Sequence, residues 1–567
     1  MQRLFLYIHS MMRNSMSVKK SAALFFVCAV LLCSCRTFDK TAGIKEYDLV
    51  DYTSESIAAT ECERIEGLLK IQMNTRALWR ALLLTSHIQN SSLAQQMLER
   101  SQQAVVEEYE KAVLEEDWQT ALRCYISLES CDYKQLSSLS LSRASLETIC
   151  LRDAPGIYNE SSASSRVSQY IKGTVTVLVD KGFKVERGMG VQDAMLGSGF
   201  FISHDGYIVT NHHVIASMVD PSYEGYARLY IKLADDPETR IPAKVVGWDS
   251  VLDLALLKAE VNAPYVFSLG FSSDLDVGDK VYAIGSPLGL DRTLTSGVIS
   301  AKDRRLFTEG LVFQIDAAVN SGNSGGPLID AQGKVQAIVF AGVENYQGLN
   351  FAIPVEYLRY ELPLLYAGGE RVHPWMCAYG KTERLPGANV SNEGVAVQYV
   401  MPGGSACLSG IKAGDVIIAF DGHTVSSLED LHQKFMQFQS ETVVKVKVRH
   451  EDKTEETLLV CLSSRPKQPG YEVYQTDLLE HSMLPLFGME LVRASTTKKL
   501  YAISKVLKAS TADELDFSES DTVQIVGVEF DPTKSYIYVT VYTKRRKNGW
   551  LEMALALSAQ LDSPYYF

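Results

Sequence analysis

Three short strings in this sequence contain the residue types that nucleophilic acyl transfer requires. TNHHV, DLALL and GNSGGP hold His213, Asp253 and Ser324, in that order along the chain. A serine hydroxyl is a weak nucleophile at neutral pH, so it needs an adjacent general base and a third group that orients the base. Histidine and aspartate suit these two roles, and the three residues therefore form a candidate catalytic triad.

Glycines stand on both sides of Ser324, at positions 322, 325 and 326. Glycine adopts backbone conformations that other residues resist, so the chain can turn tightly at this point. Such a turn would direct the backbone amides of Gly322 and Ser324 at one oxygen atom, with help from Asn323. We therefore expect Gly322, Asn323 and Ser324 to form an oxyanion hole.

Four longer stretches around these residues resemble the HtrA/Deg family of trypsin-like serine proteases, whose triad corresponds to His213, Asp253 and Ser324. By this resemblance Ala318 forms the base of the S1 pocket, and Asp316 is a structural residue of the family motif. An uncharged pocket implies cleavage of unfolded envelope proteins after small or medium apolar residues. The stretches are GSGFFISHDGYIVTNHHVI (197–215), GWDSVLDLALLK (247–258), GSPLGLDRTLTSGVISA (285–301) and QIDAAVNSGNSGGPLID (314–330).

The resemblance also implies a fold and a mode of control. Many short β-rich segments follow one another from 174 to 340, a pattern typical of paired antiparallel barrels, and we expect the protease domain to span 165–366. Family members form trimers, so a homotrimer is expected. Their activity is gated by loops near the site, which correspond here to 180–196, 301–310 and 344–348.

Length and composition limit the other functions that this chain can have. A chain of 567 residues is too long for one hydrophobic core, so several domains are expected. The net charge of −13 argues against nucleic acid as a partner, because phosphate binding needs clustered cations. Neither an HExxH string nor paired CxxC strings occur, and there is no phosphate-binding glycine loop, so we predict no metal and no cofactor.

The first residues are typical of an export signal. A lysine pair precedes the apolar stretch 22–33, which is too short to span a bilayer. The stretch ends in LCSC, which resembles the bacterial lipoprotein cleavage box. We expect a signal peptide over 1–34, starting at Met1 or Met16, and a lipid anchor on Cys35 in the cell envelope. The alternative is an ordinary secretory peptide with an incidental cysteine.

A helical domain is predicted over 36–155, because apolar residues recur there at helical spacing, with a single glycine and no proline between 47 and 150. The stretch KAVLEEDWQTALRCYISLE (111–129) resembles a tetratricopeptide helix pair. The domain is accordingly either such a repeat or a bundle of three or four helices. Seven cysteines lie beyond the leader, and the sequence leaves their pairing open.

Two further domains follow the protease. Residues 372–465 resemble a PDZ domain, in which Leu431 and Phe435 share a helix face that borders a peptide groove. The spacing of Ser426 and Glu429 predicts a capping box at the start of that helix. Residues 478–562 resemble a degenerate second PDZ domain without the glycines of a peptide site. A PDZ domain that serves only for packing is the alternative.

Two other functions fit parts of this sequence. One is a non-catalytic chaperone or scaffold that holds partners at the membrane through the helical and PDZ domains. The other is a surface-binding lipoprotein, which only the expected lipid anchor supports. The intact triad favours a serine endopeptidase over both, with unfolded proteins as substrates and peptides as PDZ ligands.

Overall fold

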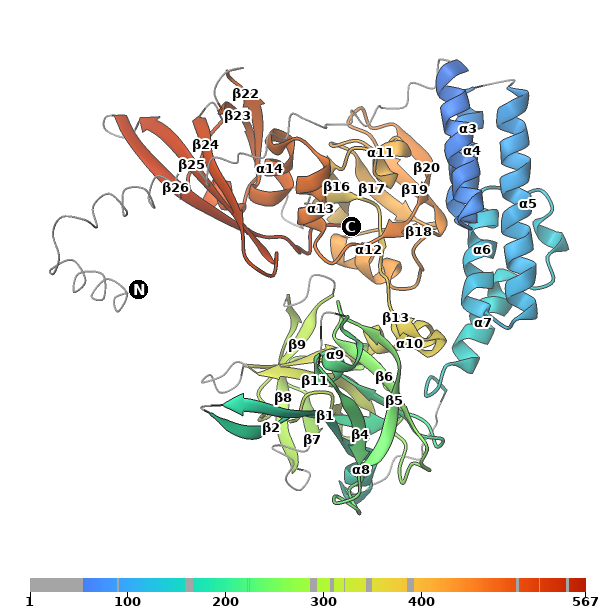
Figure 1. Cartoon of the computed structure of the whole chain (residues 1–567), viewed down its shortest axis with the longest axis vertical. Coiled ribbons are helices and arrows are strands. Elements are labelled where there is room, and N and C mark those ends of the chain that lie inside the picture. Colours follow the sequence, from blue (N-terminus) through green and yellow to red (C-terminus); the bar gives the residue numbers. More distant parts are fainter. Residues whose placement is uncertain are drawn as a thin grey trace. The chain divides into compact units, whose positions relative to one another are not determined.

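The computed structural model shows a helical region, a double β-barrel and two α+β domains, as the sequence predicted (Figure 1). The predicted signal peptide and Cys35 lie outside the described residues. No helix in the described part of the chain is long and apolar enough to cross a membrane. The description covers residues 55–567 apart from 89–90, 159–166, 187, 222, 224, 286–292, 306–309, 321, 343–348, 385–391, 496–498, 520 and 547–549.

Consecutive helices of the N-terminal region pack against one another and against the first PDZ sheet. Ser91 and Asp117 cap two of them, because their side chains accept backbone N–H groups that have no partner within the helix. Trp79 donates its indole N–H to the carbonyl of Leu459, 2.9 Å away in the PDZ sheet. The helices are α3 (Glu55–Lys70), α4 (Asn74–His87), α5 (Ser92–Leu114), α6 (Trp118–Ser130), the 3-10 turn η1 (Leu136–Ser138) and α7 (Arg143–Asp153).

Two antiparallel barrels make up the protease domain. In the first, Val175, Val177 and Val179 alternate along one strand and pack into the barrel core. The six strands of this barrel are β1 (Thr174–Glu186), β2 (Met189–Phe201), β3 (Tyr207–Thr210), β4 (Arg228–Lys232), β5 (Ile241–Asp249) and β6 (Leu254–Ala259), and the pairing of β5 with β6 closes it.

The second barrel closes in the strand order β10-β11-β12-β9-β8-β7. A shared apolar cluster, which includes Phe200 and Ile284, packs between the two barrels. The strands are β7 (Lys280–Gly285), β8 (Thr293–Arg304), β9 (Val312–Ile315), β10 (Pro327–Ile329), β11 (Val335–Gly342) and β12 (Asn350–Pro354), and the nearby helices are α8 (Val167–Gly173), α9 (His212–Val219), η2 (Ser272–Asp274) and α10 (Val355–Ala367).

The expected gating loop 180–196 is largely a β-hairpin, which corrects the prediction of a loop. β1 and β2 continue their antiparallel pairing as far as Glu186 and Met189. The side chains at the end of this hairpin are exposed, as in the case of Phe183. Glycines at positions 182, 188 and 190 interrupt this segment, and glycine is unfavourable in strands, so the short alternation of Phe183 and Val185 did not indicate a hairpin.

The first PDZ domain is a sheet in the order β15-β16-β17-β19-β20, with the helix α12 packed beside its edge strand β15. Ser427, not Ser426, caps α12, and its side chain accepts the N–H of Asp430. The capping box is thus one residue later than predicted. β13 (Gly369–Glu370), which precedes this domain, pairs in parallel with β5 of the first barrel. The elements of the PDZ domain are β14 (Pro374–Trp375), β15 (Ala378–Arg384), β16 (Asn392–Val400), α11 (Ser405–Leu408), β17 (Val416–Phe420), β18 (His423–Thr424), α12 (Leu428–Phe435), β19 (Val443–Arg449), β20 (Glu455–Cys461) and β21 (Ser463–Ser464).

The last domain is a five-stranded antiparallel sheet in sequence order, preceded by two short helices. Its apolar core includes Phe487 and Val539. All seven cysteines beyond the leader are free thiols in the described chain. The elements are α13 (Pro469–Thr476), α14 (Leu479–Phe487), β22 (Met489–Arg493), β23 (Leu500–Val506), α15 (Thr511–Glu514), β24 (Thr522–Phe530), β25 (Tyr536–Arg546) and β26 (Trp550–Gln560).

Candidate active site

His213 lies in the first turn of α9, directly after the buried strand β3. Its backbone N–H donates to Asp253 Oδ1 at 2.8 Å, and its ring Nδ1 lies 2.7 Å from Asp253 Oδ2. One carboxylate therefore fixes both the main chain and the imidazole ring. With the Nδ1 proton directed at the carboxylate, Nε2 is left as the basic nitrogen. Burial lowers the pKa of the neighbouring His212, which keeps that residue neutral.

The backbone of Asp253 is held in an unusual conformation. Its φ of 55° lies in the left-handed region, which residues other than glycine seldom adopt. Asn211 supports this conformation, because its buried side-chain amide donates to the Asp253 carbonyl at 2.8 Å. Asn211 is a positioning residue that sequence reasoning missed, although it directly precedes the two histidines in TNHHV.

Two glycines after Ser324 are required by close backbone contacts. A Cβ atom on Gly325, whose φ is 85°, would lie 2.2 Å from the Ser198 carbonyl oxygen. A Cβ atom on Gly326 would lie 2.2 Å from the carbonyl oxygen of Ile284. These distances are far below any real carbon–oxygen contact, so only glycine fits without moving the loop.

Two hydrogen bonds tie the serine loop of the second barrel to Ser198 of the first barrel, and a third joins Ser198 to Thr210 within the first barrel. The Ser198 N–H donates to the Ser324 carbonyl at 2.7 Å, and the Ser198 hydroxyl donates to the Gly322 carbonyl at 2.6 Å. Thr210 donates its hydroxyl to the Ser198 carbonyl at 2.7 Å. Because Thr210 ends the strand that precedes His213, this network connects the loop of Ser324 to the histidine. The part played by Ser198 and Thr210 was not predicted, because neither residue belongs to a motif that indicates these contacts.

The Ser324 hydroxyl itself points elsewhere in this structure. Its Oγ donates to the carbonyl of Phe340 in β11 at 3.1 Å. Among the described residues, no hydrogen bond joins Ser324 to His213. The structure thus brings His213 and Asp253 together and holds Ser324 on a loop tied to the same barrel, with its hydroxyl turned away from the imidazole.

Four family models match consecutive parts of this chain. They are a trypsin-like peptidase domain over 197–338, a PDZ domain over 381–460, a TP0546 family PDZ domain over 470–561, and a domain of unknown function over 56–150. Related sequences are named probable periplasmic serine endoprotease DegP-like. The protein from Marinomonas sp. strain MWYL1 is 35% identical over 288 residues, which is 49% of this chain and 59% of that protein.

The same name is printed for a protein from Chlamydia pneumoniae, which is 34% identical over 333 residues, or 55% of this chain and 64% of that protein. The peptidase domain and the first PDZ domain of this chain are thus similar to those of DegP-like serine endoproteases. The chain spans less than two thirds of the length of these curated relatives. Two solved structures are also similar: the HtrA-type protease AlgW with decapeptide (26% identity, TM-score 0.43, 54% of this chain and 99% of that one) and the serine endoprotease from Yersinia pestis (25%, 0.39, 54% and 100%).

The residues expected at the S1 pocket lie between β9 and β10. Ala318 is exposed, and its carbonyl accepts the hydroxyl of Thr295 at 2.9 Å. Asp316 Oδ1 accepts the backbone N–H of Val298 at 2.6 Å. That carboxylate is therefore engaged with strand β8 and supports the backbone that carries Ala318.

A buried cluster of charged residues joins the protease domain to the first PDZ domain. Arg371 donates to Glu361 Oε2 at 2.7 Å, and His373 Nε2 lies 2.9 Å from Asp249 Oδ2. Burial raises the pKa of Glu361. Burial also acts to raise the pKa of Asp249, but the charge and hydrogen bond of His373 outweigh it and hold that pKa below its usual value.

Three members of this cluster, Asp249, Glu361 and His373, have ligand atoms within 4.8 Å of one another, a spacing that a metal ion could use. The guanidinium of Arg371 already occupies the Glu361 carboxylate, however. We therefore interpret the cluster as an ion-pair network. It was not anticipated from the sequence, because its members come from three different elements.

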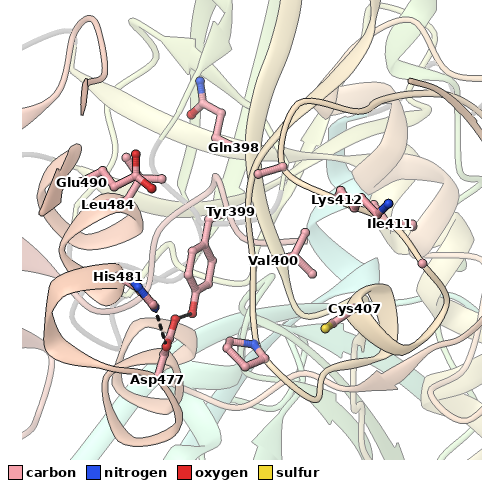
Figure 2. A pocket seen from close by; sticks show the side chains of 13 residues that line it. Gln398, Tyr399, Val400, Cys407, Ile411, Lys412, Asp477, His481, Leu484 and Glu490 are labelled. Carbon is pink, nitrogen blue, oxygen red and sulfur yellow. Dashed lines mark hydrogen bonds and ion pairs between the residues drawn. The ribbon is translucent and has the colours of Figure 1, made fainter. Parts of the chain in front are cut away.

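The two residues expected to border the PDZ groove, Leu431 and Phe435, lie on α12 and are 0% and 1% exposed. Phe567 packs in the same apolar cluster. A separate cavity of about 440 Å³ lies between β16 and α14 (Figure 2). At its wall the Tyr399 hydroxyl donates to Asp477 at 2.8 Å, and this contact fastens the last domain to the first PDZ sheet.

Proposed function

We propose that this chain is a serine endopeptidase of the HtrA type that cleaves unfolded proteins in the bacterial cell envelope. The observation that carries the proposal is the double contact between Asp253 and His213, on a barrel that is also tied to the loop of Ser324. A histidine oriented in this way is a general base, and a serine between glycines is its natural nucleophile.

The reaction begins when the Ser324 hydroxyl leaves the Phe340 carbonyl and turns to His213 Nε2. Side-chain contacts of this kind often tighten only when substrate binds. The hydroxyl oxygen then forms a bond to the scissile carbonyl carbon, and Nε2 takes its proton. Asp253 stabilises the imidazolium, and the N–H groups of Gly322 and Ser324, assisted by Asn323, stabilise the oxyanion.

Collapse of this intermediate breaks the peptide bond, and the imidazolium gives its proton to the departing amine. Water then attacks the acyl-enzyme while His213 takes one proton from it. The second collapse releases the new carboxyl terminus and returns the proton to Ser324 Oγ. All of these groups belong to the chain itself, and the proposal needs no metal or cofactor.

Specificity follows from the residues around the pocket. Ala318 offers no charge to a substrate side chain, and Asp316 is engaged with the backbone of β8. We therefore propose cleavage after small or medium apolar residues. Such side chains are buried in folded proteins and become accessible on unfolding, which makes misfolded envelope proteins the natural substrates.

The location in the envelope is supported by the name periplasmic that related sequences carry. We propose that the mature protein is held at the membrane by lipid on Cys35 and faces the periplasm or the cell surface. Unfolded proteins and PDZ-bound peptides are its proposed partners, and assembly into a homotrimer is proposed from the family.

The test is cleavage of a reduced, unfolded casein-type substrate by the protein and by its Ser324→Ala variant. We expect the variant to lose proteolysis by about 10⁶-fold, since removing the nucleophile disables the whole triad. The free energy of unfolding should change by less than about 1 kcal/mol, because Ser324 gives up one partly exposed hydrogen bond.

A fluorophosphonate label provides a second measurement on the same samples. Labelling that disappears in the Ser324→Ala variant identifies the reactive serine even where cleavage is slow. Undiminished cleavage by that variant would refute the assignment. A folded protein that neither labels nor cleaves would instead fit a binding lipoprotein on a protease frame.

A further inference from the structure

The edge of the first PDZ sheet is occupied by residues 565–567 of this same chain. β15 is an edge strand, and an edge presents backbone groups that readily pair with another strand. Tyr566 forms an antiparallel bridge with Tyr379. The N–H of Ala378 donates to the Phe567 carbonyl at 3.1 Å, and the N–H of Phe567 donates to the Ala378 carbonyl at 3.0 Å. Gly380 donates to the Tyr565 carbonyl at 3.0 Å, so the segment adds a short strand to the sheet.

The side chains of this segment alternate as those of a strand do. Phe567 is 1% exposed and packs in one apolar cluster with Leu431 and Phe435 of α12. A Cβ atom on Gly380 would lie 2.1 Å from the Ala396 carbonyl oxygen of the neighbouring strand and 3.1 Å from the Phe567 ring. The close approach of β16 is the main reason for glycine here, and the missing side chain also leaves room for the phenylalanine. The ring therefore fills the space between β15 and α12 that a bound peptide would use.

The other two aromatic rings of the segment are also engaged. Tyr566 lies 5.3 Å from the Tyr379 ring, in a cluster on the opposite side of the segment from Phe567. The Tyr565 ring lies 4.9 Å from Lys381 Nζ and 5.9 Å from the Arg305 guanidinium carbon. These two cations attract the negative face of the Tyr565 ring, and this attraction helps to hold the ring in place.

Contacts upstream guide the segment to the groove. The Leu561 carbonyl accepts the N–H of Gly470 at 2.7 Å, and Asp562 accepts the guanidinium of Arg465 at 2.6 Å. The Tyr399–Asp477 contact at the wall of the cavity holds α13 and α14 against the same PDZ domain (Figure 2). Residues 565–567 are thus tethered a few residues from fixed points, which gives them a high effective concentration at the groove.

We propose that Tyr565–Phe567 occupy the peptide groove of the first PDZ domain in cis. The ligand that competes for this groove is an extended peptide with aromatic residues spaced as Tyr565 and Phe567 are. The proposal rests on the groove named above and not on catalysis by Ser324, so it is tested by binding rather than by proteolysis.

The experiment uses the full chain with Ser324→Ala and a fluorescein-labelled peptide of the sequence LDSPYYF, measured by fluorescence anisotropy. We expect weak binding to this protein and binding at least about tenfold tighter after Phe567→Asp, because the tethered competitor is removed. Tyr538 on β25 is an exposed aromatic residue away from the groove, and Tyr538→Asp should leave binding unchanged. Equal affinity for the Phe567→Asp variant and its parent, both folded by circular dichroism, would overturn the proposal.

A second variant covers the case in which Phe567→Asp fails to fold. Tyr565 is only half-buried, so Tyr565→Ala should preserve the domain and raise peptide affinity about threefold through loss of the two cation contacts. No gain in affinity with Tyr565→Ala would then reject the proposal. Occupancy in cis also predicts that peptide affinity is independent of protein concentration. Tighter binding on dilution would assign the segment to a second copy and overturn docking in cis.

Discussion

The candidate catalytic site and the groove of the first PDZ domain are organised by different forces. At the catalytic site, backbone conformation and hydrogen bonds place polar groups: the left-handed Asp253, the crowded Gly325 and the Ser198 network. In the groove, buried aromatic packing around Phe567 dominates. We therefore expect the change of a single atom or methyl group to lower activity at the candidate catalytic site. Peptide binding in the groove should change only when a whole apolar side chain is lost.

Among changes that leave Ser324 in place, the largest effect should come from Asp253→Asn. An amide in place of the carboxylate favours the wrong imidazole tautomer, so kcat should fall by about 10⁴-fold. The fold should persist, because the amide oxygen can still accept the His213 backbone N–H. Initial rates of peptide cleavage, with circular dichroism as the check on folding, measure both outcomes.

Asp316→Asn is the matched control for that change. Asp316 accepts one backbone N–H, and an amide oxygen can do the same, so activity should stay within about threefold. A selective loss of cleavage after lysine or arginine would show that Asp316 recognises substrate, against its interpretation as structural.

A smaller effect is expected from one added methyl group, in Gly325→Ala. The new Cβ would overlap the Ser198 carbonyl, so the loop must move and carry the oxyanion donors with it. Activity should fall by about 10²-fold, the usual effect of one displaced donor. Titration with a fluorophosphonate label and kcat measurements would detect this loss.

Gly278 provides the comparison, since it also has positive φ, at 99°, but nothing lies within 4 Å of its Cβ position. Gly278→Ala should cost about 1 kcal/mol of stability through backbone strain and leave kcat unchanged. Equal activity losses at the two glycines would mean that backbone strain, and not the crowded loop, explains the result.

The smallest effect concerns His450, which belongs to the PDZ domain and lies away from its groove. Hydrogen bonds to Asp415 and Glu456 raise the pKa of His450. A raised pKa in the folded state stabilises the protein at low pH, and this contribution is lost as the pH rises through that pKa. The Tm of the parent protein should therefore include a contribution from His450 at about pH 5.5 that is absent at about pH 8.5. The difference in Tm between these two pH values should be about 1–2 °C smaller in His450→Gln than in the parent. An identical pH profile for variant and parent would contradict the assigned ion pairs.

Much of the architecture could be predicted because the relevant signals are local. The strings around His213 and Ser324, the helical periodicity before 150 and the β-rich segments each indicate structure within a few residues, and the predicted fold class is confirmed. The hairpin of β1 and β2 escaped prediction because glycines interrupt its outer part.

The details that remained out of reach depend on contacts between distant residues. Nothing in the spacing of the sequence joins Phe567 to Ala378, or Ser198 to Gly322. The direction of the Ser324 hydroxyl depends on the Phe340 carbonyl, which a motif cannot indicate. Motifs thus predict which residues carry the chemistry, and the fold decides how those residues are held.

The buried pair of Glu361 and Arg371 has a consequence for how this protein can evolve. Arg371 also donates to the carbonyls of Met436 and Phe438, so its charge is shared between the last protease helix and the PDZ domain. Without Arg371, Glu361 would be left as a buried, uncompensated carboxylate, at a cost of about 3–5 kcal/mol. A foreign PDZ domain exchanged into this protein by recombination would therefore be tolerated only if its backbone presented two carbonyl groups to Arg371, as Met436 and Phe438 do. We therefore expect an exchange of the PDZ domain alone to destabilise this protein more than an exchange of the two domains together.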